Sequence, residues 1–344
     1  MPLISTQNNL RRCGLMVMMT MLTVMLTLGS MGPGTAVAQS SSADESWQQI
    51  PDMAQKRWEA GTVVLDGMLY LFGGYTDGPK SIKHVDVFNP QDHSWKQLAD
   101  LPSAITHFNT VLDGRTVWFA GGFKDGYPGR AIDEVWNYDI DKNTYTAAPA
   151  LPEKRAGGGL ALIGRHLHYI GGLLPDRDTD SPHHWMLDLE DLEAGWTHRA
   201  PMPAPRNQFG TVTFDGKIYA MAGQFHHDSG QLDQTRVDVY DPETNSWSSG
   251  PALPHGHSHA EGSTFVHGGR IYVIGGHATP EGGRKRIDDD ILSLRPGGQW
   301  EVVGKLPTPL SSPSAAIIGD KLYVGGGSPN WRSVQPKMWV ADAP

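Results

Sequence analysis

Residues 210–249 contain the pattern that decides the fold, and they read GTVTFDGKIYAMAGQFHHDSGQLDQTRVDVYDPETNSWSS. Short apolar segments alternate here with turn-forming residues, and the clearest turns are Asp215-Gly216 and Asp241-Pro242. Such a pattern is typical of antiparallel strands joined by tight turns. We expect four strands, called a, b, c and d in chain order: Gly210 to Phe214, Lys217 to Ala222, Arg236 to Tyr240, and Ser246 to Ser248.

The same pattern recurs along the chain with a period of about fifty residues. Doublets of small residues end strand b at Gly73-Gly74, Gly121-Gly122, Gly171-Gly172, Ala222-Gly223, Gly275-Gly276 and Gly325-Gly326. An aromatic residue marks strand d at Trp47, Trp95, Tyr145, Trp196, Trp247 and Trp300. Because two independent markers keep one order and one period, we infer a series of similar four-stranded sheets.

On these markers the chain resembles the kelch repeat family of β-propellers. The glycine doublets, paired aromatics such as Tyr240 and Trp247, and the period carry the resemblance, which spans residues 46–342. Departures from the family pattern are Ala222, Tyr145 and Leu294. The resemblance implies an all-β propeller.

The number of strands predicts how the propeller closes. Strands a, b and c occur six times, the last c strand being Met338 to Asp342, and no d strand follows it. Trp47 lies in a d pattern that no a, b or c strand precedes. We therefore expect a six-bladed kelch β-propeller closed by an N-terminal strand, which leaves no open sheet edge.

The first residues predict export. Arg11 and Arg12 precede an uncharged stretch, and Ala36 to Ala38 offer a small-residue cleavage site. We expect a signal peptide over residues 1–38, cleaved after Ala38, then a short linker over 39–45 and the propeller over 46–342. The alternative is an uncleaved membrane anchor. Cleavage would leave a periplasmic or secreted protein without cysteine, since Cys13 is the only one.

Charge limits the partners. The 344 residues carry a formal net charge of −9, and nucleic-acid binding needs a basic face, so we expect no nucleic acid partner. We also expect no membrane contact beyond export, and a monomer.

The loops b–c and d–a are long and share one face, so binding residues are expected there. Arginine forks match carboxylates and amides match hydroxyls, so a glycan or a polar, acidic peptide would suit this face. The candidate binding residues are Arg57, His107, Arg155, Arg206, Asn207, Gln224, His226, His257, His259, Glu261 and His277. The same loops also carry Trp58, Glu59, Tyr75, His227 and Trp331. We expect the site to centre on Arg206, between the fourth and fifth units. Alternatively, the three arginines only satisfy loop carbonyls.

The histidines leave a second alternative. An extended segment would place His255, His257 and His259 on one side, so a metal site with His226, His227 or His277 is geometrically possible. No ligand pair has a spacing of known type, and Asp176, Asp178 and Asp180 lack the glycine and closing Glu of a calcium loop. We therefore predict neither a metal nor a cofactor. Unperturbed histidines would make binding depend on pH between 5 and 8.

Two functions remain open. The first is an exported binding module for a glycan or a polar peptide. The second is an enzyme, because exported kelch propellers include sialic acid mutarotases, which this chain resembles in architecture and export but not in any matched motif. Such a mutarotase or epimerase would need only an acid and a base, and Glu261, Glu59 or a loop histidine could serve. No catalytic residue is assigned.

Overall fold

The computed structural model describes residues 47–344, and these residues fold almost entirely into β-strands. Two short 3-10 turns interrupt them, η1 (Leu192–Ala194) and η2 (Glu261–Ser263). The expected signal peptide and linker lie outside the described residues. Across the part that the structure does describe, no helix is long and apolar enough to cross a bilayer.

The described residues contain six four-stranded antiparallel sheets. The first three, each given in the order a to d, are β2 (Gly61–Leu65), β3 (Met68–Phe72), β6 (Val85–Asn89) and β7 (Ser94–Gln97); β9 (Thr110–Asp113), β10 (Thr116–Ala120), β13 (Val135–Asp139) and β14 (Thr144–Ala148); β15 (Gly159–Ile163), β16 (His166–Ile170), β17 (His184–Asp188) and β18 (Trp196–His198). The fourth and fifth are β19 (Gly210–Phe214), β20 (Lys217–Met221), β23 (Val237–Asp241) and β24 (Ser246–Ser249); β26 (Thr264–His267), β27 (Arg270–Ile274), β30 (Asp290–Leu294) and β31 (Trp300–Lys305).

The sixth sheet combines the two ends of the described chain. It contains β32 (Ser314–Ile318), β33 (Lys321–Gly325), β34 (Met338–Asp342) and β1 (Gln48–Ile50). Strand β1 pairs antiparallel with β34, with Gln49 opposite Trp339. The indole of Trp47 also donates to the carbonyl of Lys305 in the fifth sheet, at 2.8 Å.

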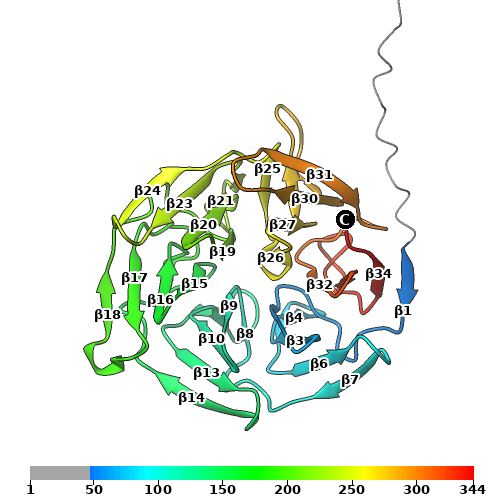
Figure 1. The fold of residues 1–344 in the computed structure, drawn as a ribbon, viewed down its shortest axis with the longest axis horizontal. Helices are drawn as coiled ribbons and strands as arrows, with labels where there is room; N and C mark the ends of the chain where they lie inside the picture. Colours follow the sequence, from blue (N-terminus) through cyan, green and yellow to red (C-terminus); the bar gives the residue numbers. More distant parts are fainter. Residues whose placement is uncertain (1–46) are drawn as a thin grey trace, which may run out of the picture. The chain divides into compact units, whose positions relative to one another are not determined.

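The sheets follow one another around a centre, with the a strands innermost and the d strands outermost (Figure 1). Each a strand lies against the a strands of both neighbouring sheets, and β2 lies against β9 on one side and β32 on the other. Short ladders in the loops add β4 (Tyr75–Thr76), β5 (Lys80–Ser81), β8 (Ile105–Thr106), β11 (Phe123–Lys124), β12 (Arg130–Ala131), β21 (Gln224–Phe225), β22 (Leu232–Asp233), β25 (Gly256–Ser258), β28 (His277–Thr279) and β29 (Arg286–Ile287).

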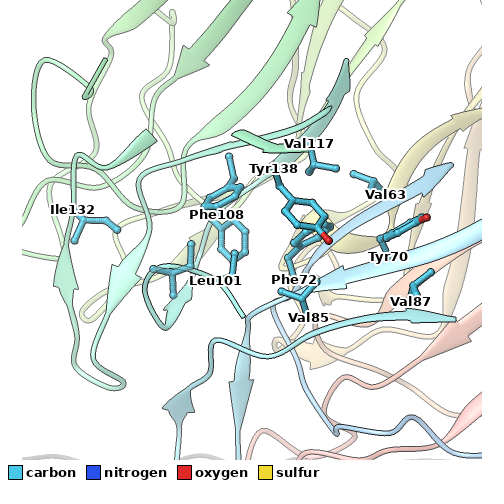
Figure 2. Close-up of a cluster of buried hydrophobic side chains, with 12 residues drawn as sticks. Val63, Tyr70, Phe72, Val85, Val87, Leu101, Phe108, Val117, Ile132 and Tyr138 are labelled. Atoms are coloured by element: carbon cyan, nitrogen blue, oxygen red, sulfur yellow. The ribbon is translucent and has the colours of Figure 1, made fainter. Parts of the chain in front are cut away.

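The core is divided into clusters, one between each pair of neighbouring sheets. Figure 2 shows the cluster between the first two sheets, where Val63 and Phe72 face Val117 and Tyr138. A four-stranded sheet cannot bury both of its faces alone, so each sheet is stabilised by its two neighbours.

The aromatic residues of strand d fasten each sheet to the preceding one. The indoles of Trp196, Trp247 and Trp300 donate to the carbonyls of Pro149, Ala200 and Pro251. Tyr145 stands where the other repeats have tryptophan, and its hydroxyl donates to the Ala99 carbonyl at 2.8 Å. The departure at Tyr145 therefore keeps the contact.

Both residues of each doublet have positive φ, where a side chain is strained. A Cβ on Gly74 would lie 2.5 Å from the carbonyl oxygen of Trp58, so glycine is required there. The sixth doublet corrects the sequence pattern by one residue: Gly326 and Gly327 have positive φ, whereas Gly325 is the last residue of β33.

Candidate functional site

The centre of the long-loop face is a ring of six residues, one from each d–a loop. All six have positive φ, and they are Glu59, His107, Gly157, Gln208, His259 and Ser312. Their backbones are joined by hydrogen bonds from one loop to the next, such as Gly157 N to His107 O at 2.7 Å and Ser312 N to His259 O at 3.0 Å. The ring therefore fixes three chemically active side chains, those of Glu59, His107 and His259, around the central axis.

A cavity of about 550 Å³ opens above this ring. Its walls combine aromatic rings, imidazoles, cations and one carboxylate, and they come from Trp58, Glu59, Tyr75, Thr76, Gly78, Pro79, His107, Tyr127, Arg177, His227, Gln231, His259, His277, Lys285, Trp331, Arg332 and Val334. We call this cavity the channel-mouth pocket. Its volume is in the range of pockets that hold small ligands.

One side of the pocket is a chain of hydrogen-bonding groups. The Asp228 carboxylate lies 2.7 Å from His227 Nδ1, and His227 Nε2 lies 3.2 Å from His107 Nε2. His107 Nδ1 contacts Thr106 Oγ1 at 2.8 Å and Glu59 Oε2 at 2.9 Å. Burial lowers the pKa of His227 to about 4, with His107 beside it adding to the shift.

This chain implies a definite placement of protons. A neutral His227 donates from Nδ1 to Asp228 and accepts at Nε2 from His107, so His107 Nδ1 carries a lone pair. The buried Glu59 Oε2, which has no hydrogen-bond partner, faces that lone pair. One added proton between the two atoms would give Glu59 its partner. Glu59 and His107 therefore form a site that can take up and release a proton inside the pocket.

The opposite side contains a second set of imidazoles. Ser258 donates to Asp233 at 2.8 Å and contacts His259 Nδ1 at 2.8 Å. Because the Ser258 proton goes to Asp233, His259 donates from Nδ1 and its Nε2 is a lone pair. The rings of His259 and His277 stack with centroids 3.8 Å apart, and the Trp331 indole donates to His277 Nε2 at 2.8 Å.

Burial changes the expected titration of these rings. It lowers the pKa of His277 to about 3 and holds the pKa of His259 well below its usual range. The imidazoles of His227, His259 and His277 are therefore neutral at pH 5 to 8. The expectation that unperturbed histidines titrate in that range is wrong for these three, because they lie out of contact with water.

The three candidate arginines do not face the pocket, which corrects the prediction that they contact a ligand. Arg206 is 0% exposed, and it donates to the carbonyls of Ala220 and Ala222 and to Asp238 at 2.6 Å. Arg57 is buried in the same way, with Asp86 and strand carbonyls as partners. These guanidiniums satisfy backbone carbonyls and one buried carboxylate, as the alternative held.

Arg155 is also buried, and its partners are Glu153, Ser181 and the ring of Trp185. The planar guanidinium fills the space between these groups, so it too stabilises the loop rather than presenting a free fork.

The remaining candidates divide between the pocket and its surroundings. Asn207 is buried and donates to Asp180 at 2.6 Å, and Gln224 is buried against it, so both amides hold loops together. His226 is exposed and does not line the pocket, and His257 is buried beside Asp288. Of the predicted residues, the structure brings together His107, His259 and His277 in the pocket.

Glu261 lies in η2, in the narrow channel below the pocket, where Glu59 and His107 also line the wall. Burial raises the pKa of Glu261 to about 8, and the nearby Glu59 carboxylate adds to the shift. The folded protein thus holds a proton that the unfolded chain releases at lower pH.

Glu261→Gln is expected to stabilise the protein at high pH. The carboxyl has a raised pKa in the folded state, so its contribution to stability is present below the unfolded value of 4.5 and is lost as pH rises towards about 8. The gain over the native chain should grow from near zero at pH 4.5 to on the order of 3 kcal/mol at pH 8. Thermal unfolding of both proteins at these two pH values measures it. Glu243→Gln, in an exposed turn, is the control, and a pH-independent difference would contradict the buried-acid assignment.

The candidate list omitted several residues that line the pocket. Glu59, Trp58, Tyr75, His227 and Trp331 lie in the loops that the sequence identified, but no residue type marked them as different from their neighbours. Two further cations, Arg177 and Lys285, lie in b–c loops and carried no signal at all. A usable signal was positional, because Glu59, His107 and His259 all stand two residues after the Arg57 position of their repeat.

Comparisons with known proteins agree with this architecture. Residues 59–102 and 205–254 match the Kelch motif. The chain is 30% identical over 175 residues to the Kelch-like protein terF of Aspergillus terreus, covering 48% of this chain and 38% of that protein. It is 27% identical over 285 residues to the Kelch repeat and BTB domain-containing protein A55 of Vaccinia virus, covering 82% of this chain and 40% of that protein. The chain thus spans less than half the length of these relatives.

A solved structure of YjhT has a similar fold, with a TM-score of 0.70. The match covers 86% of this chain and 97% of that one at 14% sequence identity. At this identity the likeness concerns the fold alone.

Proposed function

This chain is a kelch-repeat β-propeller, and we propose that it binds a small, hydroxyl-rich, acidic ligand, such as an acidic sugar, in the channel-mouth pocket. The single observation that supports this most is the composition of the pocket wall, where aromatic rings, buried imidazoles and cations surround a cavity of about 550 Å³. A glycan unit needs both apolar surfaces and polar groups at fixed positions, and this wall offers both.

The aromatic part of the wall is suited to the apolar face of a sugar ring. Trp331 is 46% exposed, yet its indole nitrogen is held by His277, so the ring has a fixed orientation. Trp58 and Tyr75 form a tilted pair with centroids 6.2 Å apart on the facing loops. Rigid aromatic rings lose little conformational entropy on binding, which favours their use as a ligand platform.

The cations of the pocket favour a negative charge on the ligand. Arg177 is held by Asp228 at 2.8 Å and lies over the ring of Phe123, with its guanidinium carbon 4.0 Å from the ring centroid. Lys285 is paired with Asp233 at 2.9 Å, and Arg332 is exposed at the rim. Both buried cations are already partnered, so they would orient a ligand carboxylate at the edge of the pocket.

We further propose that the six sheets are the blades of a six-bladed propeller that β1 closes, and that residues 1–38 direct the chain to the periplasm or outside the cell. The pairing of β1 with β34 and the contacts between successive a strands support closure. The signal-peptide pattern supports export. An extracytoplasmic location suits a ligand of glycan origin.

A second function, catalysis of sugar mutarotation or epimerisation, is favoured by one specific observation. Glu59 and His107 face each other at 2.9 Å in the pocket, and the carboxylate oxygen has no other partner. Ring opening of a cyclic sugar needs a base at the anomeric hydroxyl and an acid at the ring oxygen, and a pair that shares one proton can supply both.

Calorimetric titration with glucuronate, galacturonate and N-acetylneuraminate, beside glucose and an acidic hexapeptide, tests the proposal. We expect an acidic sugar to bind more tightly than the neutral hexose or the peptide. Trp331→Ala should weaken that binding by about tenfold, since a stacking surface is lost. Val302→Ala, at an exposed position on β31, should leave it unchanged.

The same ligands distinguish binding from catalysis. If the protein accelerates interconversion of the anomers in NMR exchange spectra, Glu59→Gln should abolish the acceleration while most of the affinity remains. If no acceleration occurs, the protein is a binding module. Tight binding of the peptide alone, or equal affinity of Trp331→Ala, would contradict the proposed ligand class and site.

A further inference from the structure

We propose that His255, His257, Asp288 and Asp290 form a binding site for a divalent transition-metal ion, with Zn²⁺ as the best match. His255 and His257 flank the first residue of β25, and Asp288 and Asp290 lie where the b–c loop enters β30. None of the four lines the channel-mouth pocket. The site is therefore separate from the proposed ligand site and does not depend on it.

The donor atoms have the spacing of a metal shell. His255 Nε2 lies 3.2 Å from Asp290 Oδ2 and 3.6 Å from Asp288 Oδ2, and His257 Nε2 lies 3.7 Å from the same Asp288 oxygen. Tetrahedral zinc with bonds near 2.1 Å places its ligand atoms roughly 3.4 Å apart. Two imidazole nitrogens and two carboxylate oxygens are also a donor set that zinc accepts, whereas calcium and magnesium prefer oxygen alone.

Two of these atoms are buried without a partner. His257 is 1% exposed and Asp288 is 0% exposed, and neither His257 Nε2 nor Asp288 Oδ2 has a hydrogen bond. A buried polar atom without a partner destabilises the fold, and a buried carboxylate oxygen does so strongly. A cation between them would satisfy both atoms at once.

The surrounding groups hold the ligands in position. Arg286 Nη1 donates to Asp288 Oδ1 at 2.6 Å, and Lys305 pairs with Asp290, which leaves one oxygen of each carboxylate directed to the centre. His255 Nδ1 contacts the Gly256 carbonyl at 3.4 Å, so this nitrogen carries the proton and Nε2 is free to bind metal. Such outer contacts are typical of metal-binding histidines and carboxylates.

Comparison of the repeats shows what the site replaces. The residue that precedes the loop bridge is Arg57 in the first repeat and Arg206 in the fourth, and each guanidinium lies against a buried aspartate. In the fifth repeat this position is His257, beside Asp288. The fifth repeat thus keeps a buried carboxylate where the others have an internal cation, but supplies none from this position. A metal ion would take the place of the guanidinium.

The rival account is a purely internal ion network. In that account His255 is protonated and pairs with both aspartates, while Arg286 and Lys305 complete the balance of charge. His257 Nε2 stays unpartnered in that network, which is why we favour a metal ion. The two accounts predict different responses to added zinc.

Calorimetric titration of the chelator-treated full chain with ZnCl₂ tests the site. We expect one equivalent to bind and the melting temperature to rise with zinc concentration. His255→Ala and Asp290→Asn should each weaken zinc binding by at least about tenfold. His198→Ala, on the exposed strand β18, should bind zinc like the native chain.

A second readout separates lost ligands from lost folding. Co²⁺ bound to the native chain should give the strong visible absorption of a tetrahedral ion, and the two variants should lack it while they unfold cooperatively in chelator. Absence of zinc binding, or binding that both variants retain, would overturn the proposal in favour of the ion network.

Discussion

A chain that begins at Pro51, and therefore lacks β1, is expected to lose most of its folding stability. Deletion removes the ladder with Met338, Trp339 and Val340, the bond from Trp47 to Lys305, and the buried side chain of Ile50. Three hydrogen-bonded pairs and two apolar side chains together are worth on the order of 5 kcal/mol, which approaches the whole stability of many domains.

Denaturant unfolding measures this loss. The control is a chain that begins at Ser46, which keeps β1 and should unfold like the full chain. We expect the shorter chain to expose the edge of β34 and to aggregate or unfold at a much lower midpoint. Equal midpoints for the two chains would show that β1 contributes little, and closure by this strand would then be wrong.

Arg206→Ala is expected to destabilise the fold strongly and not to act through the ligand. The substitution leaves Asp238, which is 1% exposed, without the buried guanidinium, and it leaves carbonyls of β20 and its doublet without a donor. Removing one partner of a buried ion pair costs about 3–5 kcal/mol. Burial lowers the pKa of Arg206 only to about 10, so the pair is charged at neutral pH.

The matched control is Arg165→Ala, which removes a bidentate pair with Asp113 at the surface. A solvent-exposed pair of this kind contributes less than about 1 kcal/mol. Folded Arg206→Ala should bind the acidic sugar with native affinity. A variant that keeps the native midpoint but loses the ligand would restore Arg206 to the binding site.

The fold could be predicted because its requirements act on single residues. Positive φ and a carbonyl 2.5 Å from a missing Cβ allow only glycine at Gly74, so the period is visible in the sequence. The three consecutive glycines from Gly325 to Gly327 show the limit. Any two of them satisfy the pattern, and only the strand register identifies Gly326 and Gly327.

The site could be predicted only as a face. The pattern placed Arg206 and His259 in the same kind of loop, but it could not show that one side chain turns inward under the sheet and the other towards the axis. The backbone decides this, because the ring positions share positive φ while their side chains range from none in Gly157 to the carboxylate of Glu59. No residue type is common to them, so sequence alone could not select them.

The most direct test of the pocket as a ligand site is the imidazole ¹H–¹⁵N spectrum of the protein during titration with the tightest-binding acidic sugar. We predict that the signals of His107, His227, His259 and His277 shift together and saturate with the calorimetric affinity, while those of His93 and His198 stay in place. Shifts confined to histidines outside the pocket, such as the exposed His226, would contradict the proposed site, as would a titration that moves no histidine signal.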